Sequence, residues 1–149
     1  MRFENKGVLV TGATGGIGRE TCLQFAAEGA AVAVTDLDFA LAERLACEIE
    51  EKGGRAVGYE LDVTNQEQTD SVVNQAAIDL GSIDIIFCNA GIREIQPAHQ
   101  LPLNEWRNVI EVNVTGVFVS AQSFAKHCIS ESKPGVIINT ASTLGVMGA

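Results

Sequence analysis

Four glycines lie close together near the N-terminus, in the segment Val8–Gly18, which reads Val-Leu-Val-Thr-Gly-Ala-Thr-Gly-Gly-Ile-Gly. Apolar residues precede them and an amphipathic stretch follows from Arg19, so the segment predicts a strand, a tight turn and a helix. Gly12 would let the chain turn off the strand, Gly16 would let a pyrophosphate approach the backbone, and Gly18 would let the helix pack on the strand. Free N–H groups and the dipole of the helix N-terminus favour phosphate there. The segment therefore predicts the binding of a dinucleotide.

Asp36 is the next residue with a chemical role in this pattern, because it ends a second short apolar run. It follows the glycine turn by roughly the 20 residues at which an acid meets the adenosine ribose hydroxyls. A carboxylate there accepts hydrogen bonds from a free 2′-OH and repels a 2′-phosphate. Leu37 follows, and Gly15 fills the loop position from which a basic side chain could reach, so we expect NAD rather than NADP. The alternative for Asp36 is to cap a helix over residues 39–52, which Asp38 could also do.

Apolar runs and amphipathic stretches alternate along the chain without a linker or a repeat. The expected strands cover residues 8–11, 31–36, 56–60, 83–88 and 135–140, and the expected helices cover residues 17–28, 39–52, 66–80, 103–112 and 113–131, the last two nearly continuous. Glycines stand where helix ends favour a positive φ, at positions 29, 53, 54 and 81. The apolar strands over residues 83–88 and 136–138 suit a sheet that is covered on both sides. The alternation predicts one α/β domain over residues 1–149, a Rossmann-type doubly wound parallel sheet with helices on both faces.

The composition excludes several classes of protein. The chain has 149 residues, of which 46% are hydrophobic, enough for one domain with a core. A net charge of −9 leaves no basic surface for a nucleic acid, which we therefore do not expect as a partner. No apolar run has the length of a membrane span. The first strand begins too early for a signal peptide, so the cytoplasm is the expected location.

The cysteines and histidines do not form a pattern that binds metal. The four cysteines form no C-x-x-C pair and lie in apolar stretches, so we expect buried thiols at Cys22, Cys47, Cys88 and Cys128. His99 and His127 are close to no cysteine, and we expect them at the surface or at a helix end. No metal site is expected.

Further motifs follow the glycine turn and Asp36 in a characteristic order: Asp62-Val63, Asn89-Ala90-Gly91, Asn113 and the run Ile137–Ser142. In this order and spacing the chain resembles the classical short-chain dehydrogenase/reductases. The glycine turn by itself satisfies both T-G-x-x-x-G-x-G and T-G-x-x-G-x-x-G, and the later motifs favour the classical pattern over the extended one. The resemblance implies an oxidoreductase that transfers a hydride between a nicotinamide cofactor and a secondary alcohol or ketone.

The resemblance also implies where the cofactor is bound. Asp62 would pair with the adenine amino group, Val63 would supply a backbone contact, and Ile92 would lie under the nicotinamide ring. Asp62 could instead cap the next helix, a role that we favour for Thr64. The residues expected to bind the cofactor are Gly12, Thr14, Gly15, Gly16, Ile17, Gly18, Asp36, Leu37, Asp62, Val63, Asn89, Ala90, Gly91 and Ile92.

Asn113 and Ser142 are the expected catalytic residues. Asn113 lies among apolar residues on a helix that we expect to be buried, where an amide without partners is costly. The resemblance implies that it perturbs this helix and holds a water in a proton relay, whereas the residues alone favour a structural hydrogen bond. Ser142 is expected to point into the crevice after the fifth strand. The resemblance implies that it bonds the substrate oxygen, whereas ordinary loop chemistry is the alternative.

The acid/base pair of the family, a Tyr followed four residues later by a Lys, does not occur in this sequence. The single tyrosine is Tyr59, and residue 63 is a valine. In the family the Lys lowers the pKa of the tyrosine so that the phenol can exchange a proton. We therefore expect the N-terminal part of a longer enzyme, truncated after the fifth strand, with an apolar edge strand and negligible turnover by itself. The alternative is a non-catalytic dinucleotide-binding module.

The expected partners are a small alcohol or carbonyl substrate and further copies of the same chain. In the family, the helix over residues 114–130 would form half of a dimer interface, which predicts a homo-oligomer. Side chains between residues 93 and 103 are expected to form a solvated rim beside the substrate. Trp106 is expected to pack in the core, as aromatic residues usually do.

Overall fold

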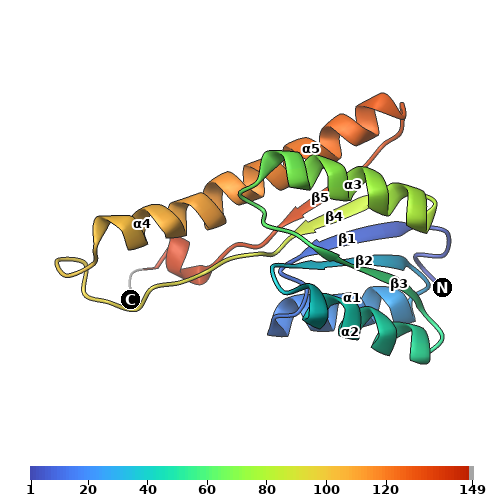
Figure 1. Ribbon diagram of the computed structural model, residues 1–149, viewed down its shortest axis with the longest axis horizontal. Coiled ribbons are helices and arrows are strands. Elements are labelled where there is room, and N and C mark those ends of the chain that lie inside the picture. The colour runs from blue at the N-terminus through green and yellow to red at the C-terminus, as the bar shows by residue number, and fades with distance from the viewer. Residues whose placement is uncertain (148–149) are drawn as a thin grey trace.

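Five parallel strands form the centre of the molecule, in the order β3-β2-β1-β4-β5 (Figure 1). The computed structural model describes residues 1–147. The strands are β1 (Gly7–Thr11), β2 (Ala31–Asp36), β3 (Arg55–Glu60), β4 (Ile85–Cys88) and β5 (Val136–Asn139). The helical segments are α1 (Gly16–Ala27), α2 (Phe39–Glu51), α3 (Gln66–Leu80), α4 (Leu103–Ile110), the π-helical turn η1 (Glu111–Thr115), α5 (Gly116–Ser130) and the 3-10 turn η2 (Thr143–Gly145). The predicted α/β fold is confirmed.

Helices cover both faces of the sheet, with α1 and α2 on one side and α3 and α5 on the other (Figure 1). Successive residues of a strand point to opposite faces, so each strand contributes to two separate cores. Val8 and Val10 pack in the core under α1 and α2, whereas Leu9 packs in the core under α3 and α5. All three are fully buried, which places β1 at the centre of the molecule.

The predicted helix ends are mostly confirmed. Gly29, Gly53 and Gly81 have φ values of 95°, 83° and 86°, the left-handed conformation that terminates a helix readily. Gly54 does not adopt a positive φ, so that prediction is wrong. Its role is steric, because a Cβ there would lie 2.7 Å from the Cγ2 of Ile49.

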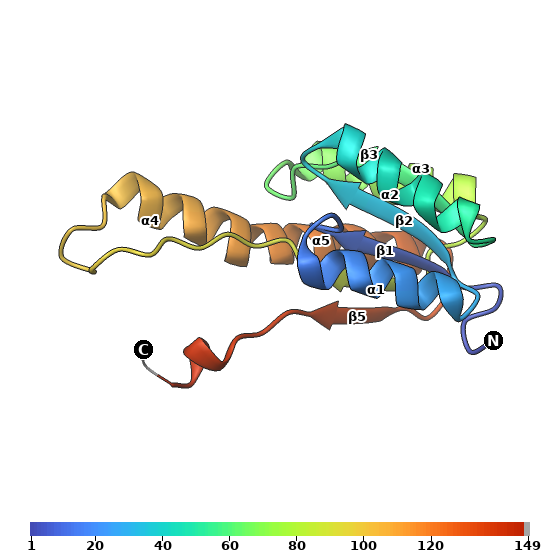
Figure 2. The same ribbon diagram turned by 90° about the horizontal axis from the view of Figure 1, so that it is seen from below.

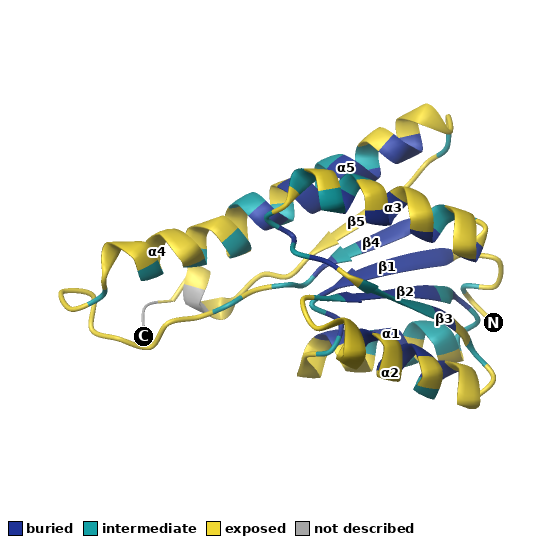
Figure 3. Cartoon of the chain, viewed as in Figure 1, coloured by how far each residue is buried: buried dark blue, intermediate teal, exposed yellow. Residues whose placement is uncertain are grey.

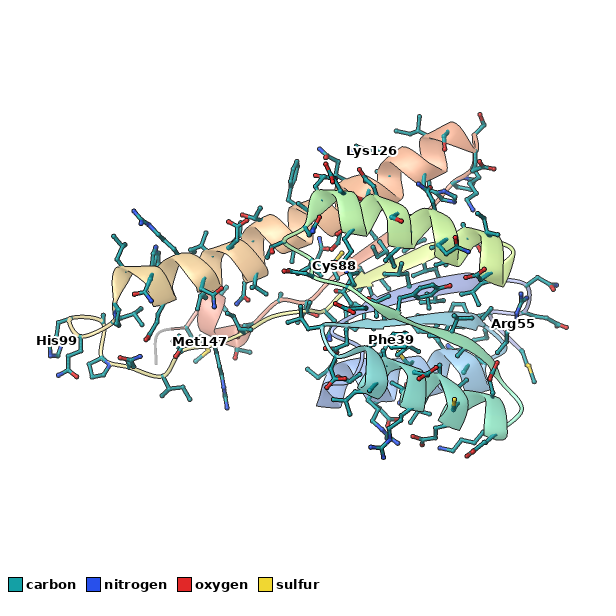
Figure 4. All side chains as sticks on the ribbon, in the orientation of Figure 1. Phe39, Arg55, Cys88, His99, Lys126 and Met147 are labelled. Carbon is teal, nitrogen blue, oxygen red and sulfur yellow. The ribbon has the colours of Figure 1, made fainter. Side chains whose placement is uncertain are left out.

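The helix that follows β4 is continuous from α4 through η1 into α5 and extends far beyond the sheet (Figure 2). Figure 3 shows α4 mostly exposed, and none of its residues is buried. The expected core position of Trp106 is therefore wrong, since this side chain is 53% exposed. Figure 4 shows His99 at the tip of the same projection, in the loop before α4.

Strand β5 forms one edge of the sheet and is exposed along its whole length. The exposed fractions of Val136, Ile137 and Ile138 are 53%, 42% and 39%. The apolar edge strand expected from the sequence is confirmed, but the expectation that residues 136–138 would be covered on both sides is wrong for the described residues.

The cysteines are free thiols, and three of them are buried as predicted. Burial raises the pKa of Cys22 to about 12 and that of Cys88 to about 11, so both thiols stay protonated at neutral pH. Cys47 is exposed on α2, which corrects the prediction for that residue. His127 lies in the last turn of α5, at a helix end as expected, but it is buried there, with Nδ1 3.3 Å from the Oδ1 of Asn74.

Gly58 allows β3 and α2 to approach each other closely, because a Cβ at this position would lie 2.7 Å from the backbone N of Glu43. We expect Gly58→Ala to lower the free energy of unfolding by about 1–3 kcal/mol, the usual cost of overpacking. The measurement is urea unfolding followed by circular dichroism. Gly145→Ala is the control, because no described atom lies within 4 Å of a Cβ there. Equal midpoints for the two variants would contradict the prediction.

Candidate functional site

A cavity of about 840 Å³ opens at the carboxyl ends of the central strands. In an open parallel sheet this edge is where ligands bind, because the strand order reverses there and the loops diverge. The residues that line it are Gly12, Thr14, Gly15, Gly16, Ile17, Asp36, Leu37, Leu61, Asp62, Val63, Asn89, Ala90, Gly91, Ile92 and Arg93. The structure therefore brings together every residue expected to bind the cofactor except Gly18, and their contact with a cofactor remains a prediction.

Gly18 is absent from the lining because it serves the packing of the glycine turn. A Cβ on Gly18 would lie 2.3 Å from the carbonyl oxygen of Gly12, so only glycine lets α1 begin this close to β1. Gly12 has a φ of 60°, and a Cβ on it would lie 2.8 Å from the Cα of Ala90. By contrast, no described atom lies within 4 Å of a Cβ at Gly16, where the backbone borders the cavity.

Asp36 ends β2 with its carboxylate held at the cavity. Its Oδ2 accepts hydrogen bonds from the backbone N of Thr14 at 2.9 Å and from the Oγ1 of Thr14 at 2.7 Å. Its Oδ1 accepts from the backbone N of Leu37 at 2.9 Å. The N-cap of α2 is Asp38, whose side chain accepts from the backbone N of Leu41. The capping role considered for Asp36 is therefore wrong.

Asp62 lies after β3 and lines the same cavity. Its Oδ1 accepts hydrogen bonds from the backbone N of Thr64 at 2.9 Å and from the Oγ1 of Thr64 at 2.7 Å. The N-cap of α3 is Asn65, whose side chain accepts from the backbone N of Gln68. Neither Asp62 nor Thr64 caps the helix, so that expectation is wrong. The Asx-type turn instead holds the Asp62 carboxylate in place.

Thr11 joins the end of β1 to the segment after β4, and the sequence analysis missed it. Its buried Oγ1 accepts hydrogen bonds from the backbone N of Asn89 and of Ala90, both at 3.0 Å. The Nδ2 of Asn89 donates in return to the carbonyl oxygens of Thr11 and Gly12, at 3.2 and 3.1 Å. The feature of the sequence that could have indicated this role is a hydroxyl residue directly before the glycine turn.

Asn113 lies in the π-helical turn η1, and it is exposed rather than buried as expected. Its Oδ1 accepts a hydrogen bond from the backbone N of Ile92 and its Nδ2 donates to the carbonyl oxygen of Ile92, both at 2.8 Å. The amide thus anchors the cavity-lining segment to the long helix. The perturbed helix is confirmed and the structural hydrogen bond is present, whereas the water-holding role stays a prediction.

Neither Ser142 nor Tyr59 is among the residues that line this cavity. Ser142 is exposed between β5 and η2, and its carbonyl oxygen accepts from the backbone N of Gly145. Tyr59 donates its hydroxyl to the Oδ2 of Asp79, at 2.8 Å. Burial and the Asp79 carboxylate raise the pKa of Tyr59, so its phenol stays protonated at neutral pH.

Two classes of site receive no support among the described residues. No cluster of three or more His, Cys, Asp or Glu side chains within residues 1–147 could hold a metal ion. None of the helices in that part of the chain combines the length and apolar character that a membrane crossing needs.

Comparison with known proteins identifies the family. Residues 6–149 match the family described as short chain dehydrogenase, and the chain belongs to this family of oxidoreductases. It is 36% identical to cis-4-hydroxycyclohexanecarboxylate dehydrogenase of Sinomonas cyclohexanicum over 98% of this chain and 58% of that protein. It is 35% identical to cyclohexanol dehydrogenase of an Acinetobacter species, over 99% of this chain and 59% of that protein. The chain thus spans about three fifths of the length of these relatives.

Solved structures agree with this assignment. A short-chain type dehydrogenase/reductase from Mycobacterium marinum superposes with a TM-score of 0.94 at 38% identity, over 99% of this chain and 60% of that one. An NAD+-bound xylitol dehydrogenase superposes with a TM-score of 0.93 at 37% identity, over 100% of this chain and 57% of that one.

We expect the Thr11 hydroxyl to stabilise the junction between β1 and the segment after β4. Thr11→Val leaves the part-buried N–H groups of Asn89 and Ala90 without their acceptor, and an unsatisfied buried donor costs about 1–3 kcal/mol. We therefore predict a lower free energy of unfolding for Thr11→Val in urea, and near wild-type stability for Thr11→Ser, which keeps the hydroxyl. Loss of stability in Thr11→Ser but not in Thr11→Val would contradict the prediction, because it would assign the contribution of Thr11 to its methyl group rather than to the hydrogen bonds.

Proposed function

We propose that this chain forms the NAD-binding part of a dehydrogenase that acts on a secondary alcohol or ketone. The observation that carries the proposal is the Asp36 carboxylate, held by Thr14 and Leu37 at the edge of a cavity that the glycine turn also lines. The NAD+-bound xylitol dehydrogenase, which shares this fold over the whole chain, supports a nicotinamide dinucleotide as the ligand.

The cavity fits such a dinucleotide in size and in chemistry. Its volume of about 840 Å³ lies within the range of cofactor sites. The backbone at Gly16 and the start of α1 would hold the pyrophosphate, since free N–H groups and the helix dipole favour negative charge. Asp36 would accept the ribose hydroxyls, and Asp62 would face the adenine amino group. The segment from Asn89 to Ile92 would support the second ribose and the nicotinamide.

The bound cofactor would supply the hydride acceptor, and the chain would supply orientation and part of the proton path. Asn113 would fix the cavity wall through Ile92 and hold a water in the proton relay. Ser142 would hydrogen-bond the substrate oxygen and stabilise the charge that develops there. Tyr59 is not placed to act as the acid or base, because its hydroxyl donates to the Oδ2 of Asp79 and it is not among the residues that line the cavity. We therefore propose negligible turnover for this chain by itself.

A second candidate is a module that binds the dinucleotide without catalysis. The observation in its favour is that both polar atoms of the Asn113 side chain bond to Ile92, a structural role that needs no reaction. Oxidation of a secondary alcohol, followed through NADH absorbance, distinguishes the two. Alcohol-dependent NADH formation by the chain when it is joined to a segment that carries Tyr-x-x-x-Lys supports the dehydrogenase, whereas turnover by the chain alone would contradict the negligible activity proposed for it. Binding of NAD+ without turnover in either form supports the module.

We predict that the chain prefers NAD+ to NADP+ and that Asp36 is the reason. A carboxylate favours the ribose hydroxyl and repels a 2′-phosphate, and a hydrogen bond to a charged group is worth about 1.5–3 kcal/mol. Asp36→Ala should weaken NAD+ binding about tenfold or more and narrow the difference between the two nucleotides. Isothermal titration calorimetry measures both Kd values. Glu67→Ala is the control, since it removes an exposed carboxylate in the first turn of α3. An unchanged ratio of Kd values in Asp36→Ala would contradict the prediction.

We also propose a homo-oligomer that forms through the long helix. Apolar residues recur every four positions along it, and all are exposed: Trp106, Ile110, Val114 and Phe118. Exposed apolar surface of this extent is typical of an interface. Sedimentation velocity should show a species larger than the monomer, and Phe118→Asp should dissociate it. Ile78→Asp, at an exposed position of α3, should leave it intact. A wild-type monomer at all concentrations would refute the proposal.

A further inference from the structure

Thr14 is the residue through which the glycine turn and the end of β2 are joined. It lies in the turn between β1 and α1, and both of its donors, the backbone N and the Oγ1, reach the same oxygen of Asp36. The distances of 2.9 and 2.7 Å are typical of hydrogen bonds to a charged acceptor. The pair thus connects the part of the cavity suited to phosphate with the part suited to ribose.

These bonds determine how the Asp36 carboxylate is oriented. The side chain is only partly buried, so packing alone does not fix its torsion angles. Thr14 holds Oδ2 and the backbone N of Leu37 holds Oδ1, so the plane of the carboxylate is fixed from both sides. Thr14 is itself β-branched, which restricts its χ1 angle and keeps the hydroxyl in place.

The charge of Asp36 is left intact by this arrangement, because Thr14 is a neutral donor. The nearest basic side chain in α1 is that of Arg19, whose Nη2 lies 2.7 and 2.6 Å from the two carboxylate oxygens of Glu48 on α2. Arg19, Thr14 and Glu48 line a second cavity, to which α2 contributes most of the other residues. The Arg19 guanidinium is thereby paired with α2, and none of the ion pairs among the described residues involves Asp36.

We propose that Thr14 is a positioning residue for nucleotide choice: it holds the Asp36 carboxylate so that an adenosine ribose with a free 2′-OH is accepted and one with a 2′-phosphate is rejected. This inference rests on the proposed function and assigns a residue that acts through Asp36. The hydroxyl of Thr14 contributes to NAD+ affinity because it fixes the acceptor before the ligand arrives, which lowers the ordering cost of binding.

The test is a double-mutant cycle on nucleotide binding, measured by isothermal titration calorimetry with NAD+ and NADP+. The variants are Thr14→Val, Asp36→Ala and the double variant, with Thr14→Ser as the conservative replacement. We expect Thr14→Val to weaken NAD+ binding about fivefold, since one of the two donors remains, and to change NADP+ binding less than twofold. Thr14→Ser should restore the wild-type Kd. In the Asp36→Ala background, Thr14→Val should change NAD+ binding less than twofold. The reason is that the effects of mutations at two residues that act as a unit do not add.

Thr21→Val is the matched control. It makes the same hydroxyl-to-methyl change in α1, beside a different cavity that Arg2 and Phe3 line. Circular dichroism establishes that each variant is folded, and Thr14→Ala replaces Thr14→Val if the valine variant does not fold. A readout without nucleotide is hydrogen exchange of the Thr14 amide, which should be faster in Asp36→Ala than in the wild type.

The outcomes separate this inference from the proposed function. If the wild-type chain binds neither nucleotide, the proposed function fails, and the inference fails with it. If the wild type prefers NAD+ but Thr14→Val has the same ratio of Kd values, only the inference is overturned. If Thr14→Val weakens NAD+ binding equally with and without Asp36, Thr14 contacts the nucleotide independently, which also overturns the positioning role.

Discussion

The close approach of α1 to β1 is the constraint on which the rest of the site depends. A Cβ at Gly18 would lie 2.3 Å from the carbonyl oxygen of Gly12, so the helix can start this near the strand only when residue 18 is glycine. The close start lets the backbone N–H groups of the first turn border the cavity. The glycine turn also places Thr14 within hydrogen-bond distance of Asp36.

Thr11 and Asn89 join the end of β1 and the glycine turn to the segment after β4. Their hydrogen bonds exchange donors and acceptors between the end of β1 and the segment after β4, so polar atoms of these two segments pair directly with each other. Buried polar groups need such partners, because an unpaired one costs about 1–3 kcal/mol. These hydrogen bonds join two loops of the cavity wall, since Gly12, Asn89 and Ala90 all line the cavity.

The sequence predicted the fold and nearly the whole cavity lining because both depend on local patterns. The glycine spacing, the apolar runs and the acid at the end of β2 can each be recognised within a segment of about 40 residues. Each of these patterns belongs to a single strand–turn–helix unit. The failures have a different cause. Trp106 and Asn113 were expected to be buried because apolar residues surround them, but burial depends on what packs against a helix, and no residue of α4 or η1 is buried.

Other predictions were wrong because neighbouring polar residues compete for the same helix-capping role. Asp62, Thr64 and Asn65 can all cap a helix, and spacing alone cannot choose among them. The structure selects Asn65, because the backbone N and the hydroxyl of Thr64 are both bonded to Asp62. Thr11 was missed for a related reason, since its role is to accept from residues about 78 positions away in the chain.

The π-helical turn explains how the long helix can serve the cavity although α4 projects away from it. Each residue of an α-helix rotates the chain by about 100°, so a wider turn changes the direction of every side chain that follows. At η1 this brings the amide of Asn113 to the backbone of Ile92, where two hydrogen bonds of 2.8 Å compensate for the weakened helical pattern. Ile92 lines the cavity, so Asn113 ties this part of the cavity lining to the long helix. Cofactor binding and the proposed proton path are thus joined through one side chain, which accounts for a polar residue at a costly position within a helix.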